Sequence, residues 1–190
     1  LRAGAAGLNN KPSETPSGDL FGPPPVGLFF APAAAPAPAG GEGGAFTARI
    51  QPMHRSLLIT GASRGIGAAA AVLAAQRAWD VAINYTRDAA AAESVAARVR
   101  ACGRRALVIQ ADVSDEAAVL AMFAAVDREF GRLDGLVNNA GVVDQPARVD
   151  EMSLQRLTRM FAINLTGSFL CAREAVKRMS TKHGGKGGAI

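Results

Sequence analysis

A glycine-rich segment at residues 60–67 limits the fold of this chain more than any other feature of its sequence. The segment reads Thr-Gly-Ala-Ser-Arg-Gly-Ile-Gly, follows a short apolar run at residues 56–59 and precedes an alanine-rich stretch with helical character. Glycine has no Cβ atom, so it permits positive φ angles and lets a phosphate group approach the backbone amides closely. A strand, a glycine turn and a helix N-terminus in this order predict a binding site for the pyrophosphate of a dinucleotide.

The spacing of the glycines is informative in itself. Gly61, Gly65 and Gly67 form a Gly-x-x-x-Gly-x-Gly pattern, which differs from the Gly-x-Gly-x-x-Gly pattern usual in dinucleotide-binding folds. The alternative interpretation is an ordinary loop before a helix, in a chain that holds 21 glycines in 190 residues. The flanking strand and helix patterns favour the dinucleotide site.

The composition divides the chain into two parts. Nine of the ten prolines lie within residues 1–52, together with nine glycines and eleven alanines, and this part has no hydrophobic periodicity. We predict a disordered Ala/Gly/Pro-rich tail at residues 1–52, which fits neither a secretory signal nor a transit peptide. Met53 would make an ordinary start that leads into a first strand, so we expect the folded protein to begin there and to occupy residues 53–190.

From Arg55 onward, short β-rich runs alternate with helical patterns, which predicts right-handed βαβ units and a parallel sheet. The first strand is predicted to end at Thr60, and later strands to occupy residues 80–85, 106–111 and 134–138. Helices are predicted at residues 65–77, 88–101, 114–131 and 153–182, and residues 187–190 resemble the first step into a fifth strand. The predicted fold class is α/β, a Rossmann-type doubly wound parallel sheet that is truncated at the start of its fifth strand.

Two of the predicted helices carry apolar residues at helical spacing. In the first helix, the residues that share a face are Ile66, Ala70, Leu73 and Ala74. In the third helix, the residues that we assign to the core are Val119, Met122, Phe123, Val126 and Phe130. Ser114 is the predicted N-cap of this third helix.

Charge and cysteine usage limit the possible partners. The formal net charge of +5 belongs to residues 53–190, but no aromatic or groove-reading pattern indicates nucleic acid. The residues interpreted as the solvated end of a helix are Arg98, Arg100, Arg104 and Arg105. Cys102 and Cys171 lack the spacing of metal ligands or of a disulfide framework, which predicts a reducing, cytoplasmic setting and no metal site. No run approaches the length of a membrane span, so no membrane partner is expected.

Four motifs, taken in order, closely resemble those of the short-chain dehydrogenase/reductase family. They are the glycine segment 60–67, Ala111-Asp112-Val113, Asn138-Asn139-Ala140-Gly141, and Asn164 within a helical pattern. The resemblance covers residues 55–190, and residues 164–179 are most similar to bacterial sugar-dehydrogenase and oxoacyl-reductase-like members. It implies an oxidoreductase that moves hydride between a nicotinamide and a small-molecule carbonyl or alcohol, and a full-length parent that forms a homo-oligomer.

The motifs give a set of candidate cofactor-binding residues. The set is Thr60, Gly61, Ser63, Arg64, Gly65, Ile66, Gly67, Arg87, Asp112, Val113, Asn138, Ala140 and Gly141. By resemblance, Asp112 and Val113 would hold the adenine, and Asn138, Ala140 and Gly141 would line the central sheet and the ribose. The alternatives are a strand-end turn at Asp112 and a common asparagine-rich turn at Asn138.

The choice of cofactor can be argued from charge. An NAD enzyme usually places a carboxylate at the end of the second strand, where it binds the ribose 2′-hydroxyl and repels a phosphate. Here the end of the strand reads Asn84-Tyr85-Thr86-Arg87, without an acid, and Arg64 and Arg87 offer two guanidinium groups for a phosphate. We therefore expect NADP(H), with NAD(H) possible because Asp88 follows closely; the alternative for Arg87 is an exposed charge at a helix start.

Asn164 lies inside a helical pattern, where asparagine has no propensity advantage and competes for backbone hydrogen bonds. The resemblance implies that it belongs to the catalytic set and holds a water in the proton relay. The alternative is a polar contact between helices.

The remaining catalytic groups that the resemblance implies are a serine, a tyrosine and a lysine four residues after that tyrosine. The one tyrosine of this chain is Tyr85, in the second strand, and Ala89 stands four residues after it. We therefore expect the cofactor-binding portion of a reductase, inactive as 190 residues. The alternatives are a non-catalytic dinucleotide-binding module, a truncated product, or an adaptor whose proline-rich tail recruits partners.

Overall fold

The structure, a computed structural model, describes residues 54–190. The predictions for the tail at residues 1–52 and for a start at Met53 lie outside these residues. The described part begins with β1 (Arg55–Ile59), α1 (Gly65–Gln76), β2 (Trp79–Tyr85), α2 (Ala89–Ala101) and β3 (Ala106–Gln110). It continues with α3 (Glu116–Phe130), β4 (Gly135–Val137), α4 (Leu154–Phe161), a π-helical turn (Ala162–Thr166) and α5 (Gly167–Met179).

The four strands form one parallel sheet in the order β3-β2-β1-β4. The chain moves outward from β1 to β3 and then returns to the other side of β1, which is the reversal that defines a doubly wound sheet. Next to β4, Ala189 pairs in parallel with Gly135 and exchanges backbone hydrogen bonds with Asp134 and Leu136 at 3.1 and 3.0 Å. The predicted Rossmann-type α/β fold is confirmed, and a single parallel bridge lies where the sequence predicted the first step into a fifth strand.

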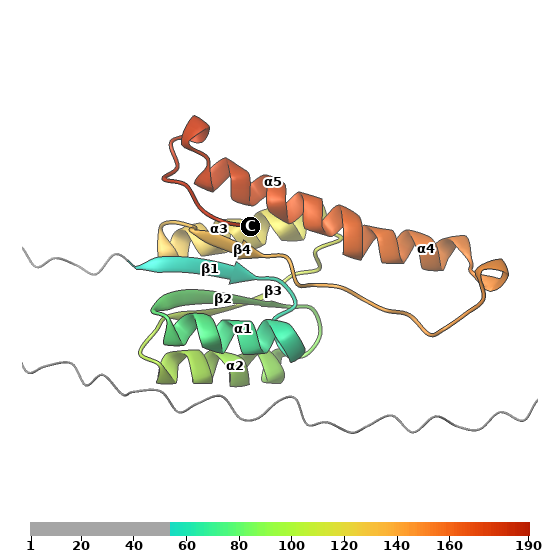
Figure 1. Ribbon diagram of the computed structural model, residues 1–190, viewed down its shortest axis with the longest axis horizontal. Coiled ribbons are helices and arrows are strands. Elements are labelled where there is room, and N and C mark those ends of the chain that lie inside the picture. Colours follow the sequence, from blue (N-terminus) through green and yellow to red (C-terminus); the bar gives the residue numbers. More distant parts are fainter. Residues whose placement is uncertain (1–53) are drawn as a thin grey trace, which may run out of the picture. The chain divides into compact units, whose positions relative to one another are not determined.

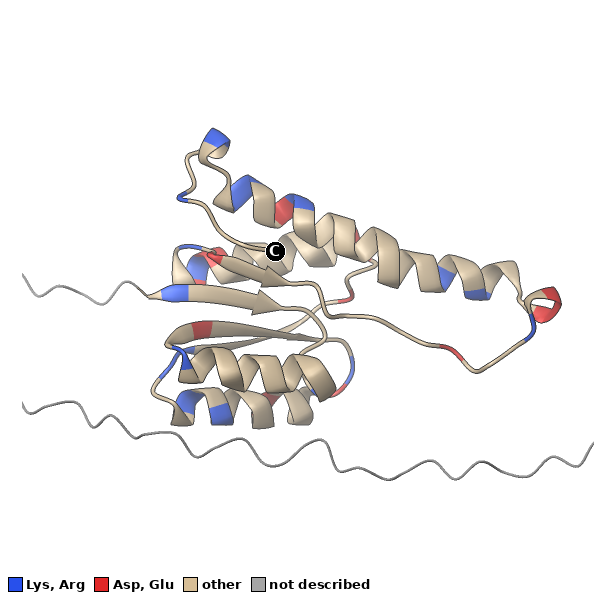
Figure 2. Ribbon diagram, in the orientation of Figure 1, with Lys and Arg blue, Asp and Glu red and all other residues tan. Residues whose placement is uncertain are grey.

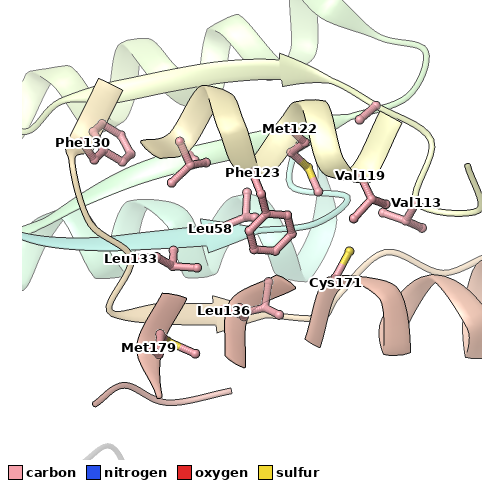
Figure 3. Packing of buried hydrophobic residues seen from close by; sticks show 14 of the residues in the cluster. Leu58, Val113, Val119, Met122, Phe123, Phe130, Leu133, Leu136, Cys171 and Met179 are labelled. Atoms are coloured by element: carbon pink, nitrogen blue, oxygen red, sulfur yellow. The ribbon is translucent and has the colours of Figure 1, made fainter. Parts of the chain in front are cut away.

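Helices cover both faces of the sheet (Figure 1). Helices α1 and α2 lie on one face, over a core of small and β-branched residues centred on Ile59, Val81 and Ile83. Helices α3 and α5 lie on the other face, over a core that contains Leu58, Phe123 and Leu136 (Figure 3). All of the apolar residues predicted for the core side of α3 are buried, which confirms that face.

The face that α1 buries is not the one that the apolar spacing indicated. The buried residues are Gly67, Ala68, Ala71 and Ala75, whereas Ile66 is 83% exposed and Leu73 is 47% exposed. An alanine-rich helix is apolar on every side, so its larger residues do not identify the buried face. The small residues turn inward because they let the helix axis approach the sheet closely.

Two helix boundaries also differ from the predictions. Helix α3 is capped by Asp115, whose carboxylate accepts hydrogen bonds from the amides of Ala117 and Ala118 at 2.9 and 3.4 Å. The predicted cap, Ser114, instead donates its hydroxyl to Asp112 at 2.7 Å. Either residue type can cap a helix, so the sequence alone could not choose between these neighbours.

The helix predicted over residues 153–182 is interrupted by the π-helical turn Ala162–Thr166 and ends at Met179. Directly after this turn, Gly167 packs against Val113 so closely that an added Cβ would lie 2.8 Å from the Val113 Cγ2 atom. The π turn therefore joins two helical segments that face different parts of the fold. Such turns leave no mark in hydrophobic spacing, and they are frequent at functional sites.

Arg104 and Arg105 do not belong to a solvated helix end, although Arg98 and Arg100 are exposed as predicted. Arg104 and Arg105 form ion pairs with the buried carboxylate of Asp80, the second residue of β2, at 2.7 and 2.8 Å. Figure 2 shows an acidic segment near the start of this strand. Burial raises the pKa of Asp80, but the hydrogen bonds from Arg105 and the charges of both arginines outweigh it, so the pKa is lowered overall. The ion pairs of Asp80 with Arg104 and Arg105 therefore connect the start of β2 to the start of β3.

Within residues 54–190, no helix is both long enough and apolar enough to cross a membrane.

The core under α3 can be tested at Phe123, which is fully buried. We expect Phe123→Ala to lower the free energy of unfolding by about 3–5 kcal/mol, because the large cavity cannot collapse completely. Leu120→Ala on the same helix, where the side chain is 43% exposed, should cost less than about 1 kcal/mol. Urea unfolding measures both values, and equal effects of the two substitutions would contradict the assigned helix face.

The Asp80 cluster predicts a pH dependence of stability. A pKa that is lowered in the folded state stabilises the fold above the ordinary value of 3.8, and this contribution is lost as the pH falls below it. We expect Asp80→Asn to destabilise the fold at pH 7 by about 1–3 kcal/mol, and the gap from wild type to narrow in acid. Asp150→Asn, at a side chain that is 68% exposed, is the matched control. A gap that stays constant from pH 7 to pH 3 would contradict this assignment.

Candidate functional site

A cleft of about 390 Å³ lies at the carboxyl ends of the strands, where the strand order reverses. Loops after all four strands line it, together with α4 and the π turn. The lining residues are Gly61, Ser63, Arg64, Tyr85, Thr86, Arg87, Asp88, Asp112, Val113, Asn139, Ala140, Gly141, Val142, Arg159 and Ile163. The volume is in the range of small-molecule and cofactor sites.

The predicted site residues divide into two groups. The ones that line the cleft are Gly61, Ser63, Arg64, Arg87, Asp112, Val113, Ala140 and Gly141. The ones that do not line it are Thr60, Gly65, Ile66, Gly67, Asn138 and Asn164. Several residues of the second group hold the walls of the cleft in place through hydrogen bonds and close contacts.

The glycine turn is shaped by close backbone contacts. Gly61 has a φ angle of +61°, and a Cβ atom there would lie 2.9 Å from the Ala140 Cα atom. At Gly67, a Cβ atom would lie 2.5 Å from the Asn139 Nδ2 atom. Both positions therefore require glycine, because a side chain would push the β4 loop away from the turn.

The N-terminus of α1 opens directly from this turn. Arg64 occupies the N-cap position in an extended conformation, and its side chain makes no capping hydrogen bond. The first amides of a helix have no partner within the helix, and they carry the positive end of its dipole. A phosphate can therefore bind at this helix start, as the sequence predicted for the turn as a whole.

Thr60 connects the end of β1 to the loop after β4. Its buried hydroxyl oxygen accepts hydrogen bonds from the amides of Asn139 and Ala140, both at 3.0 Å. In return, the Asn139 side chain donates to the carbonyls of Thr60 and Gly61 at 2.8 and 3.0 Å. Thr60 thus positions the turn, and Asn139, which the sequence did not single out as a site residue, forms part of the cleft wall.

Asn84 is the second connection to the turn. Its side chain is 1% exposed, accepts a hydrogen bond from the Gly61 amide at 3.1 Å and donates to the Ala111 carbonyl at 3.0 Å. The ends of β1, β2 and β3 are therefore held by one amide group. In the sequence, Asn84 is a polar residue near the end of an apolar run, and from the sequence alone we interpret it only as the lack of an acid at that place.

Asp112 faces the cleft as a carboxylate. Hydrogen bonds from the Ser114 hydroxyl and amide, at 2.7 and 2.9 Å, lower the pKa of Asp112 despite its partial burial. The positive charges of Arg159 and Arg87 lower this pKa further. Both hydrogen bonds from Ser114 reach the Oδ1 atom, so Asp112 combines the predicted strand-end turn with an ionised group beside the cleft.

Asn138 and Asn164 connect the loop after β4 to the helical segment formed by α4, the π turn and α5. The Asn138 side chain donates to the Ser168 carbonyl at 3.0 Å, so it points toward α5 and away from the cleft. The Asn164 side chain accepts from the Val142 amide at 2.8 Å and donates to the Val142 carbonyl at 2.9 Å. Asn164 thus makes a polar contact to a loop, whereas the alternative interpretation placed that contact between helices.

The cleft carries three arginines whose side chains make no hydrogen bond or ion pair with any of residues 54–190. These are Arg64, Arg87 and Arg159. The nearby carboxylate of Asp88 does not neutralise them, because it caps α2 by accepting from the Ala91 amide at 2.9 Å. Sequence reasoning missed Arg159, which lies in a helical pattern outside every motif.

No group of three or more potential metal ligands occurs among residues 54–190. Cys102 and Cys171 are both free thiols. Burial raises the pKa of Cys171 to about 11, so this thiol stays protonated near neutral pH.

A reversal of strand order with a glycine turn at its centre places this chain among Rossmann-like α/β proteins. The family model described as short chain dehydrogenase matches residues 55–190, and the chain belongs to that family. The chain is 49% identical over 133 residues to the uncharacterized oxidoreductase YgfF of Escherichia coli, covering 70% of this chain and 54% of that protein. It is 38% identical over 136 residues to an L-rhamnose 1-dehydrogenase (NAD(P)(+)) of Sphingomonas, covering 72% and 52%.

Solved structures of short-chain dehydrogenases/reductases also match this chain. A short-chain dehydrogenase/reductase mutant of Serratia marcescens matches with a TM-score of 0.64 and 38% identity, over 68% of this chain and 53% of that one. A short-chain type dehydrogenase/reductase of Mycobacterium marinum matches with a TM-score of 0.63 and 35% identity, over 67% and 51%. The chain therefore spans about half the length of the relatives that it matches.

The role of Asn84 can be tested by Asn84→Leu, which keeps the size of the side chain and removes both polar groups. We expect a loss of about 1–3 kcal/mol for each backbone group left buried without a partner, at Gly61 and Ala111. Gln110→Met is the control, since it removes one exposed hydrogen bond to the Thr86 carbonyl. Urea unfolding gives the free energies, and a loss no larger than that of the control would contradict the role of Asn84.

Proposed function

We propose that this chain is the cofactor-binding portion of an NADP(H)-dependent short-chain reductase. The observation that carries the proposal is the combination of an uncapped α1 N-terminus with Arg64 and Arg87, which have no partner within residues 54–190. A backbone anion site supports the binding of a pyrophosphate, and two nearby guanidinium groups support the binding of an additional phosphate. NAD(H) lacks the 2′-phosphate that these two guanidinium groups would bind.

The residues of the cleft suit the parts of such a cofactor. In the proposed complex, the amides around Gly65 and Ile66 bind the pyrophosphate, and Arg64 and Arg87 bind the 2′-phosphate. Asp112 accepts a hydrogen bond from the adenine amine, and Val113 provides an apolar contact. The loop at residues 139–142 lies beside the ribose and nicotinamide, held there by Thr60 and Asn164.

When bound, a nicotinamide supplies or accepts the hydride that a carbonyl or alcohol substrate exchanges. We propose that Asn164 assists proton transfer as well as fixing the wall. Its Oδ1 atom receives one hydrogen bond from Val142, and a carbonyl oxygen can accept a second one from a water. The side chain can therefore hold both the loop and a water of a proton relay.

The reaction also needs a proton donor, and Tyr85 is the single tyrosine in the sequence. Tyr85 lies at the end of β2, on the adenosine side of the proposed cofactor position. We propose that the serine, tyrosine and lysine of the parent reductase belong to sequence beyond these 190 residues. In that case the 190-residue chain binds NADP(H) without reducing carbonyls, as a non-catalytic module or a truncated product also would.

An exposed apolar stripe supports a homo-oligomeric parent. It runs along α4, the π turn and α5, and consists of Leu154, Phe161, Leu165, Phe169 and Val176. A stripe of this length on one helical arm is typical of an association surface. The two free thiols suit the reducing cytoplasm, which we propose as the location of the protein.

Cofactor choice can be tested by calorimetric titration of the natural protein, with any sequence beyond Ile190 retained, against NADPH and NADH. We expect tighter binding of NADPH, and we expect Arg64→Gln to reduce that preference by about 10- to 100-fold while leaving NADH binding nearly unchanged. Arg98→Gln, an exposed charge change on α2, is the control. Equal affinity of the wild type for both cofactors would contradict the NADP(H) assignment.

The reaction itself is tested by comparing the natural protein with the 190-residue chain in an assay of NADPH-dependent carbonyl reduction. We expect turnover only with the longer protein. Turnover by the 190-residue chain at an ordinary enzymatic rate, on the order of 10 per second, would contradict the proposed division of residues. Binding without turnover by both proteins would favour the non-catalytic module.

A further inference from the structure

Arg159 lies in α4, which extends beyond the carboxyl ends of the strands (Figure 1). Its side chain lines the same cleft as the glycine turn and the loop after β2. Residues of α4 reach this place because the π turn separates α4 from α5, which packs over the sheet. The cleft thus has a wall that comes from a helix about 90 residues later in the sequence than the glycine turn.

A neighbouring arginine on the same helix gives a useful contrast. Arg156 forms an ion pair with Asp144 at 3.4 Å and donates a hydrogen bond to the Gln145 carbonyl, so its side chain fixes the preceding loop. Arg159 makes no hydrogen bond or ion pair with residues 54–190. No hydrogen bond or ion pair within residues 54–190 therefore accounts for the positive charge at this position.

The position of Arg159 relative to Asp112 indicates which part of a ligand it meets. Both side chains line the cleft, yet they form no ion pair with each other. Asp112 lies shortly after β3 and Arg159 lies in α4, so the two side chains reach the cleft from different elements. Consistent with this placement, the charge of Arg159 contributes to the lowered pKa of Asp112. A guanidinium group is planar and stacks on aromatic rings, and a purine fits beside such a group.

We propose that Arg159 is a cofactor-contact residue whose guanidinium group lies against the adenine base, across from Asp112. This inference rests on the proposed binding of a dinucleotide in the cleft. Arg159 thereby differs in task from Arg64 and Arg87, which recognise the 2′-phosphate. Since both NADPH and NADH carry adenine, Arg159 strengthens the binding of both and does not distinguish them.

The test is calorimetric titration of the natural protein, with any sequence beyond Ile190 retained, against NADPH, NADH and 5′-AMP. We expect Arg159→Gln to weaken the binding of all three ligands by a common factor of about 3- to 30-fold, with the NADPH-to-NADH ratio unchanged. Arg159→Lys should recover less than half of this loss in binding free energy, because an ammonium group keeps the charge without the stacking plane.

Matched controls separate this effect from charge and folding. Arg98→Gln on α2 removes the same charge from an exposed site outside the cleft, and it should leave all three affinities unchanged. Thermal unfolding of each variant should stay within about 2 °C of wild type, because Arg159 is exposed.

The outcomes distinguish this inference from the proposed function. Wild-type protein that binds neither dinucleotide would overturn both. Wild-type binding that Arg159→Gln leaves intact would overturn the role of Arg159 alone. A loss confined to NADPH would reassign Arg159 to the 2′-phosphate, and full recovery by Arg159→Lys would replace stacking by simple charge attraction; either result overturns the inference.

Discussion

The fold of this domain depends on how three buried polar side chains satisfy the backbone at the end of β1. Asn84 accepts from the Gly61 amide, the Thr60 hydroxyl accepts from two amides of the β4 loop, and Asn139 donates to the carbonyls of Thr60 and Gly61. A buried amide or carbonyl without a partner costs about 1–3 kcal/mol, so these hydrogen bonds remove the main energetic obstacle to a sharp buried turn. Because each bond joins two strands, the turn also fixes the relative positions of the strand ends.

The helices on the two faces of the sheet are held by different means. Helices α1 and α2 approach the sheet through small residues and are held by close packing. Helices α3 and α5 are also joined by charge, since Arg178 of α5 binds Asp127 of α3 at 2.8 Å; within α5, Arg178 also binds buried Glu174 at 3.0 Å. Burial raises the pKa of Glu174, but hydrogen bonds from Lys177 and Arg178 lower it overall, so the carboxylate stays ionised. The layer of α3 and α5 thus combines apolar packing with ion pairs, whereas α4 has no buried residue.

The sequence predicted the features that arise from local patterns. The strand and helix alternation, the glycine turn and the buried face of α3 around Phe123 all depend on spacing within one segment. The features that it did not predict depend on partners far away in the chain. Asp80 meets Arg105 at 25 residues' separation, and Asn164 meets Val142 at 22 residues. The buried face of α1 could not be predicted either, because alanines occur on every side of this helix and its apolar pattern does not distinguish one face from another.

The charge of the cleft illustrates why a net charge is a poor guide to function. Most arginines of the described part are neutralised or engaged by nearby groups, as Arg104 is by Asp80 and Arg178 is by Asp127. The acids near the cleft are likewise engaged, Asp88 by a helix amide and Asp112 by Ser114. Among the arginines whose side chains make no hydrogen bond or ion pair within residues 54–190, Arg64, Arg87 and Arg159 line this cleft, whereas Arg77, Arg98 and Arg128 lie outside it. A polar network that satisfies the acids and leaves arginines without partners is suited to a phosphate-bearing ligand, whatever the net charge of the whole chain.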